Sequence, residues 1–139
     1  MPYQLTFDES HDYSRADARD GIAMPVTLRA GGAAAHLTAS VDTGASFCVF
    51  ERGYGELLGL GVETGEPQVF GTATGTFKAY GHAVTLSTLG LSFEVKVYFA
   101  GHEGFGRNVL GRRGWLDQVR LGLVEHDGRL YLSGYGDEG

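Results

Sequence analysis

Asp42 is the residue whose type and surroundings best suit acid–base chemistry in this sequence. It is followed by Thr43 and Gly44, and the triplet lies between Val41 and the apolar run 47–50. A carboxylate held in apolar surroundings can act as a general base or acid toward a bound substrate. Asp, Thr and Gly also favour an Asx-type turn at the end of a strand. The triplet alone is therefore compatible with both a catalytic carboxylate and simple turn chemistry.

The elements around Asp42 are expected to be short strands joined by tight turns. Residues 22–30 and 33–41 alternate in the manner of a hairpin around Gly31-Gly32, and the second strand would deliver Asp42 at its end. Residues 51–63 are interrupted by glycine and indicate a turn or a short helix. Residues 67–100 predict two long hairpins, with turns near 73–76 and 89–90.

The remaining segments complete one mostly-β domain. The sequence predicts a helix over 113–119 and a hairpin around Asp127-Gly128. Near the N-terminus, residues 3–7 alternate like a short strand, and residues 8–20 indicate a loop or short helix with Ser14 as its N-cap. We therefore divide the chain into an N-terminal extension (1–21), a single domain (22–133) and a flexible tail (134–139).

Composition excludes several classes of function. The chain has 139 residues, a net charge of −6 and no cluster of basic residues, which argues against nucleic acid and anionic membranes as partners. Neither a targeting segment nor a run of about 18 apolar residues is visible, so we expect a cytoplasmic protein. The five histidines lack metal-binding spacing, and neither a metal nor a cofactor is expected. The single cysteine, Cys48, is predicted to be a buried, inert thiol.

Three motifs in order resemble the retropepsin-like aspartic peptidases, in particular their bacterial members. The stretch VDTGAS (residues 41–46) is similar to the active-site loop of that family. The family's second hallmark is a pair of hydrophobic residues and a glycine before a helix. It is matched here by Val109, Leu110, Gly111 and Arg112, and Gly111 lies 69 positions after Asp42 (111 − 42). Between them, GTATG (residues 71–75) resembles the tip of the family's flap hairpin. The resemblance covers about residues 22–132.

The resemblance implies an all-β fold, a retropepsin-like closed β-barrel with one short C-terminal helix that assembles into a homodimer. In that family two aspartates share one proton; one activates water and the other polarises the peptide carbonyl. This chain has one Asp-Thr-Gly triplet, so Asp42 would be half of a dyad and a second copy of the chain would supply the other half.

The resemblance also assigns roles to the neighbours of Asp42. Gly44 would turn the backbone sharply and offer its N–H to the carboxylate, Thr43 would reach the partner's loop, and Ala45 removes one hydroxyl donor. Val109, Leu110, Gly111 and Arg112 would pack under the loop. Ser46 stands where many relatives have an aspartate, so Arg112 lacks that acidic partner. Substrate binding is expected at Ser46 and in the flap, at Thr72, Ala73, Thr74, Gly75 and Thr76.

The expected function is an aspartic endopeptidase that cleaves extended peptides and needs no cofactor. The alternative is a dimerisation or peptide-binding module of the same fold that no longer hydrolyses its ligand. A small β-barrel binding protein with a chance triplet is a third interpretation. Phe70, Phe77 and Tyr80 flank the flap and could contact substrate or only stiffen the hairpin.

Overall fold

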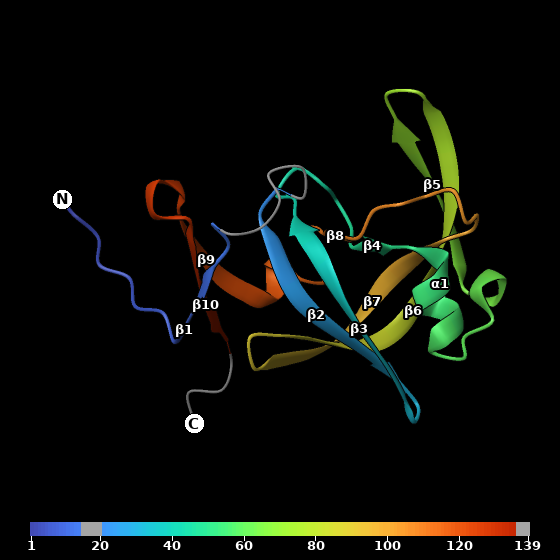
Figure 1. The fold of residues 1–139 in the computed structure, drawn as a ribbon, viewed down its shortest axis with the longest axis horizontal. Coiled ribbons are helices and arrows are strands. Elements are labelled where there is room, and N and C mark those ends of the chain that lie inside the picture. The colour runs from blue at the N-terminus through green and yellow to red at the C-terminus, as the bar shows by residue number, and fades with distance from the viewer. Residues whose placement is uncertain (15–20, 136–139) are drawn as a thin grey trace.

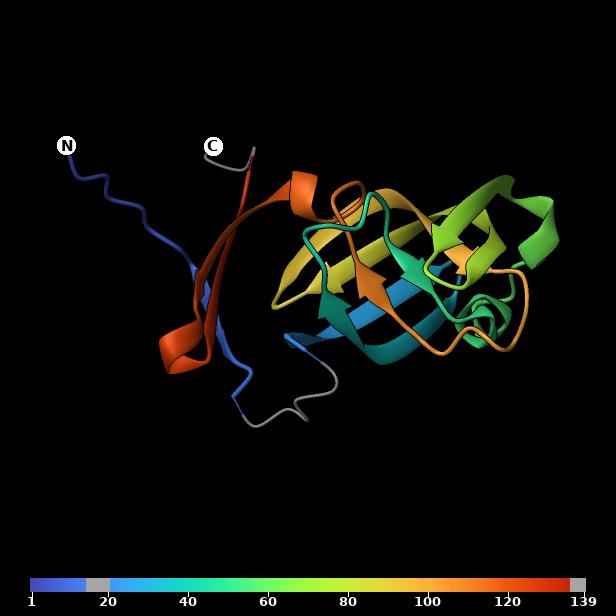
Figure 2. The ribbon, with the colours of Figure 1, turned by 90° about the horizontal axis from the view of Figure 1, so that it is seen from above.

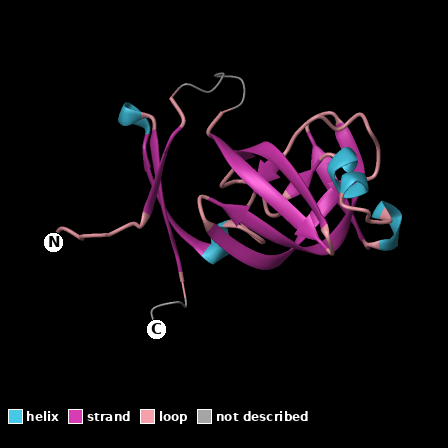
Figure 3. Cartoon of the chain, turned by 60° about the horizontal axis from the view of Figure 1, so that its bottom comes forward, coloured by secondary structure: helices cyan, strands magenta, loops and turns pink. Residues whose placement is uncertain are grey.

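Short strands joined by glycine-containing turns make up most of the chain in a computed structural model that describes residues 1–14 and 21–135 (Figure 1, Figure 3). The strands are β1 (Glu9–Asp12), β2 (Ala23–Ala30), β3 (Ala33–Val41), β4 (Val49–Phe50), β5 (Glu66–Thr72), β6 (Gly75–Thr88), β7 (Leu91–Ala100), β8 (Val109–Leu110), β9 (Val119–Val124) and β10 (Arg129–Gly134). Helical segments are α1 (Arg52–Leu57) and the 3₁₀ turns η2 (Val62–Thr64), η3 (Leu116–Gln118) and η4 (Glu125–Asp127). The expectation of a mostly-β protein is confirmed.

A closed ring of strand pairings forms the body of the molecule. The larger sheet has the order β2-β3-β8-β4-β7-β6-β5, and an additional pairing of β2 with β6 closes the strands from β2 to β6 into a ring. In that pairing Leu28 lies opposite Leu86. Closure gives the strands of the ring hydrogen-bonding neighbours on both sides and leaves β5 as the open edge of this sheet. β5 remains outside the ring, as the partner of the first half of β6.

The β5–β6 hairpin extends beyond the barrel (Figure 1). β6 is 14 residues long; residues 75–81 pair with β5 and residues 79–88 with β7. A two-residue turn at Ala73-Thr74 ends the hairpin, and Phe70 lies opposite Phe77 in its middle. Both turns predicted between residues 67 and 100 are therefore found, at 73–74 and 89–90.

A second, three-stranded sheet lies beside the barrel and contains the first and the last strand of the chain (Figure 2). β10 is its central strand and pairs with β1 and with β9. Leu130 and Leu132 of β10 are completely buried and belong to the same apolar cluster as the barrel interior. One continuous core therefore holds the two sheets together.

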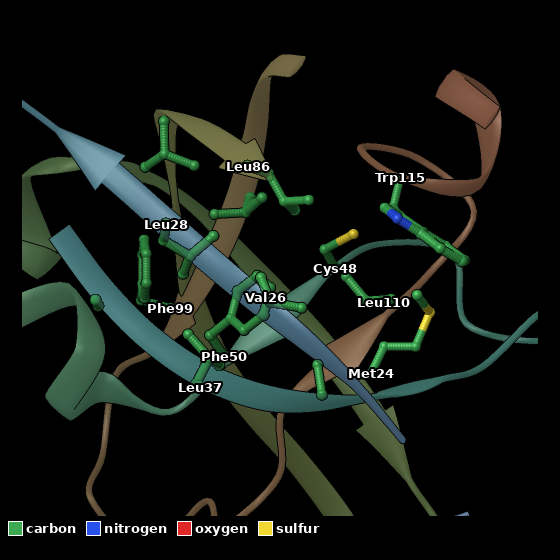
Figure 4. Close-up of a cluster of buried hydrophobic side chains, with 14 of the residues drawn as sticks. Met24, Val26, Leu28, Leu37, Cys48, Phe50, Leu86, Phe99, Leu110 and Trp115 are labelled. Carbon is green, nitrogen blue, oxygen red and sulfur yellow. The ribbon is translucent and has the colours of Figure 1, made fainter. Parts of the chain in front are cut away.

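The core is built from alternate residues of the strands, as Figure 4 shows. Leu28, Leu86, Phe50 and Phe99 have no exposed surface, because inward-facing positions recur every second residue along each strand. Trp115 closes the end of this core and is also fully buried. Its indole N–H donates to the Thr88 hydroxyl at 3.2 Å, so the one polar atom of the ring has a partner.

The predicted helix over 113–119 is wrong. The segment contains only the 3₁₀ turn η3, and β9 begins directly at Val119. Gly114 has φ of 103°, a conformation incompatible with helix, and its N–H donates to the Asp117 carboxylate at 3.1 Å. The described part of the chain thus lacks the C-terminal helix that was expected, and its α-helix is α1, within the segment predicted to be a turn or short helix.

The N-terminal prediction is also corrected. Residues 3–7 form no strand, whereas Glu9–Asp12, within the stretch assigned to a loop or helix, form β1. The main-chain N–H of Asp8 donates to the Ser133 hydroxyl at 2.8 Å. Phe7 packs on Tyr131 and does not extend the pairing of β1 with β10. Ser14 donates to the Asp12 carboxylate; the helix it was expected to cap lies outside the described residues. Gly134, assigned to the tail, is the last residue of β10, and residues 136–139 are not described.

Replacing Leu28 by alanine should destabilise the fold by about 2–5 kcal/mol, because it leaves a cavity where the barrel closes. The matched control is Leu57→Ala in α1, where the leucine is 61% exposed and the cost should stay within about 0.5 kcal/mol. Urea unfolding followed by circular dichroism measures both. Equal losses in the two variants would contradict the assignment of the core.

Candidate active site

Asp42 is positioned by an unusual order of neighbouring strands. β3 and β4 follow each other in the sequence, but β8 lies between them in the sheet. β8 runs parallel to β3, with Val41 opposite Leu110, and Val109 lies opposite Val49 of β4. The connection from β3 to β4, residues 42–48, must therefore pass over the end of β8. We call this connection the Asp42 loop.

Main-chain hydrogen bonds fix the Asp42 loop to the residues that follow β8. The N–H of Asp42 donates to the Leu110 carbonyl at 3.0 Å. The N–H groups of Arg112 and Arg113 donate to the carbonyls of Ala45 and Ser46 at 2.8 and 2.9 Å. These hydrogen bonds involve main-chain atoms and do not depend on the identity of the side chains. They therefore give the Asp42 carboxylate a defined position.

One hydrogen bond orients the Asp42 carboxylate itself, and a second fixes its main chain. The Gly44 N–H donates to Oδ1 at 3.0 Å, and the Ala45 N–H donates to the Asp42 carbonyl at 3.1 Å. The predicted donation from Gly44 is thus present. The sharp turn assigned to Gly44 does not use a conformation reserved for glycine, because its φ is not positive and an added Cβ would contact Oδ1 at an ordinary 3.4 Å.

Gly111 is the position where the absence of a side chain is required. A Cβ there would lie 2.2 Å from the Phe47 carbonyl oxygen and 2.9 Å from that of Ala45. Both obstacles are backbone atoms of the Asp42 loop. Val109 and Leu110 are buried beneath the same loop, so three of the four residues predicted to pack there do so. The fourth, Arg112, packs through its backbone and leaves its side chain exposed.

A groove of about 630 Å³ separates the Asp42 loop from the β5–β6 hairpin. Asp42, Gly44, Ala45, Ser46, Val109 and Thr72, all singled out in the sequence, line it. Thr43 is exposed and does not line it. Ala73, Thr74, Gly75 and Thr76 are exposed at the hairpin tip and also lie outside its lining. The floor of the predicted site is therefore assembled in one chain, whereas most of the predicted flap contacts are not.

An aromatic cluster forms one wall of the groove and was only partly anticipated. Phe70 stacks on Phe77 across the hairpin at 5.3 Å between ring centroids, and Phe47 of the Asp42 loop meets Phe70 edge-on at 5.8 Å. Phe105, in the connection between β7 and β8, packs on Phe77 at 4.7 Å. Tyr80, the third aromatic residue considered in the sequence, packs against the main core instead.

Phe105 and Arg107 are among the groove residues that the sequence did not reveal, together with Phe47, Val49, Gln68 and Val69. Phe105 and Arg107 lie in the glycine-rich stretch GHEGFGRN (101–108), directly before β8. Their position in the sequence, directly before the Val109-Leu110-Gly111 motif, could have indicated that they lie near the site. The chain that leads into β8 must pass beside the Asp42 loop. Nothing in the spacing alone shows which way such loop side chains point.

Among the described residues, Asp42 is the only carboxylate that lines the groove or the smaller hollow on its other side, which is lined by Ser40, Arg107 and Asn108 among others. Within the same ranges, no three metal-ligating side chains come together. In that part of the chain, too, no helix has the length and apolar character needed to cross a bilayer. A single carboxylate can accept or donate one proton, so chemistry that requires two such groups needs a second chain.

The sequence matches no model of a known protein family, and none of the curated proteins gives a significant match. The assignment of a function therefore depends on the chemistry of the site.

Replacing Gly111 by alanine should destabilise the protein by about 3 kcal/mol, because the new methyl group cannot avoid the Phe47 and Ala45 carbonyls. Gly32→Ala in the β2–β3 turn is the matched control; a Cβ there meets nothing within 4 Å. Thermal unfolding of both variants tests this contact. A Gly111 variant as stable as the Gly32 variant would show that the loop is not held against residue 111.

Cys48 should not react with thiol reagents in the folded protein. Burial raises the pKa of its thiol to about 12, although a hydrogen bond from the Gly111 N–H at 3.4 Å acts in the opposite direction. The reactive thiolate is then scarce at about pH 8, and the sulfur is also inaccessible. Iodoacetamide labelling followed by mass spectrometry should modify Cys48 only after unfolding in guanidinium. Rapid labelling of the native protein would contradict this burial.

Proposed function

We propose that the protein is a retropepsin-like aspartic endopeptidase that works as a homodimer, with Asp42 of each copy on the two-fold axis. The observation that carries the proposal is the Asp42 loop. Its carboxylate accepts the Gly44 N–H, and its backbone is held against Gly111 at the floor of a groove with an aromatic wall. A surface turn aspartate would need neither the buried support from β8 nor the groove above it.

The chemistry follows from two carboxylates sharing one proton. The ionised carboxylate removes a proton from a water molecule as the water oxygen attacks the peptide carbonyl carbon. The protonated carboxyl of the other copy donates its hydrogen to the carbonyl oxygen as negative charge develops there. Collapse of the tetrahedral intermediate breaks the C–N bond; the leaving amine takes up a proton from one carboxyl of the dyad, and a hydroxyl of the intermediate returns its proton to the other carboxylate as the product carbonyl forms. Atoms and charges balance without a metal or a covalent enzyme intermediate.

The groove suits an extended peptide. The hairpin strand β5 contributes Gln68, Val69 and Phe70 to one wall, and the Asp42 loop forms the floor. A substrate strand lying between them can exchange main-chain hydrogen bonds with both sides while alternate side chains enter the apolar wall. The aromatic cluster favours a large hydrophobic side chain next to the scissile bond.

Asp42→Asn should abolish peptide hydrolysis, with a loss of about 10²–10⁴-fold or more in kcat/KM, because asparagine cannot exchange the proton. Cleavage of a peptide library at protein concentrations that favour the dimer, across about pH 4 to about pH 7, provides the assay. Asp127→Asn, in the exposed β9–β10 turn, is the matched control and should keep full activity.

Dimer formation has its own signature in the same assay. At low protein concentration the rate of the wild type should rise with the square of concentration, because only the assembled pair contains a dyad. Sedimentation gives the oligomeric state independently. A protein that sediments as a dimer and cleaves nothing would favour the silent peptide-binding module, and cleavage by the Asp42→Asn variant would remove the aspartic mechanism.

A further inference from the structure

The residues that line the groove and its adjoining hollows carry a net positive charge, whereas the net charge of the whole protein is negative. The chain carries 17 acidic and 11 basic side chains, yet the charged residues beside the groove are mainly arginines. Arg107 lines the groove and the hollow behind Asp42. Arg112 and Arg113 line a further hollow of about 570 Å³, which shares Ser46 and Phe47 with the groove and so adjoins it.

No ion pair joins these three guanidinium groups to an acid among the described residues, and the same holds for Arg29, Lys78, Arg120 and Arg129 elsewhere on the surface. Arg52 is paired with Glu56 and Glu63, and Lys96 with Glu66. Arg113 lies over the Phe47 ring at 6.0 Å, beside the aromatic wall. The position on the Asp42 loop that could have carried a neutralising acid holds Ser46, which is uncharged.

One acidic residue shares the hollow with Arg112 and Arg113. Asp117 lines it, but its Oδ1 already accepts the Gly114 N–H at 3.1 Å and the Gln118 amide at 3.4 Å. No ion pair within the described residues joins Asp117 to either arginine. The hollow therefore contains two positive groups and one negative group, and keeps unused hydrogen-bond donors for a carboxylate.

We propose that the groove selects acidic peptide segments, with a large apolar residue held against the Phe70–Phe77 wall and Glu or Asp side chains on either side of it. Arg107 would meet the acidic side chain at one end, and Arg112 with Arg113 those at the end beyond Ser46. This substrate class rests on the proposed function for its cleavage, but peptide binding can be measured without hydrolysis. Arginine suits the role because its planar fork can bind a carboxylate through two hydrogen bonds.

Two labelled peptides of equal length test the inference. Both carry a central phenylalanine; one has glutamates on both sides, and the other has glutamine at the same positions. Fluorescence anisotropy with the Asp42→Asn protein measures affinity with hydrolysis disabled. The acidic peptide should bind about ten-fold more tightly at low salt, the size of effect expected from several exposed ion pairs acting together. The advantage should shrink as salt rises from about 0.05 M to about 0.5 M.

Variants in the same background locate the effect. Arg112→Gln with Arg113→Gln, and separately Arg107→Gln, should each lower affinity for the acidic peptide more than affinity for the glutamine peptide and so reduce the preference between the two. Arg29→Gln is the matched control, an exposed arginine on β2 that lies away from the groove. The backbone donors of Arg112 and Arg113 survive substitution, so the Asp42 loop should keep its support.

The outcomes separate this inference from the proposed function. Preference for the acidic peptide without cleavage of either peptide by the wild type would retain the inference and count against the peptidase. Equal affinity for both peptides, or no binding of either at low salt, would overturn the inference whether or not the protein is a peptidase. A double arginine variant that weakens dimerisation and leaves the peptide preference intact would also overturn it, because the arginines would then face the second copy.

Discussion

The close contact between Gly111 and the backbone of the Asp42 loop is the constraint on which the site depends. Because β8 lies between β3 and β4, the loop that joins those strands has to cross the end of β8 with no room for a side chain beneath it. The loop's carbonyls then reach the N–H groups of Arg112 and Arg113, and the Asp42 N–H reaches Leu110. The carboxylate is consequently placed by main-chain bonds from two distant segments. This arrangement requires that residue 111 have no side chain. The requirement is strict because the atoms that a Cβ would meet belong to the backbone of the Asp42 loop, which cannot move aside as a side chain can.

That constraint gives the groove one rigid side and one adjustable side. The floor consists of the Asp42 loop and buried strand ends, whereas the opposite wall is a hairpin whose tip residues are exposed. The aromatic contacts from Phe47 through Phe70 and Phe77 to Phe105 hold the middle of the hairpin near the floor and leave its tip without such contacts. Reacting groups placed on a rigid floor keep their geometry while a hairpin tip adapts to the ligand.

The sequence predicted those parts of the fold that local rules decide. Alternation and two-residue turns located β2, β3, β6 and β7 closely, and the Asp42 and Gly111 motifs identified the two segments that meet. The errors lie where tertiary contacts outweigh the local pattern. The stretch 113–119 has helix-forming residues, but Gly114 adopts a left-handed conformation and Val119 is drawn into the ladder with β10. Residues 3–7 alternate like a strand, yet β10 offers its hydrogen bonds to residues 9–12. The direction of the Phe105 and Arg107 side chains depends on loop packing that no periodic pattern records.

Net charge and local charge lead to different expectations for this protein. A chain of charge −6 should repel acidic ligands at long range, and two copies in the proposed dimer would repel them more. Within about 10 Å, however, the nearest groups dominate because salt screens the rest. In a dimer each groove end would carry its own unpaired arginines, while the two Asp42 carboxylates would share one proton and contribute a single negative charge. The negative surface charge of the protein would thus slow the association of an acidic peptide segment. Once the segment is bound, the groove arginines would stabilise the complex and slow its dissociation.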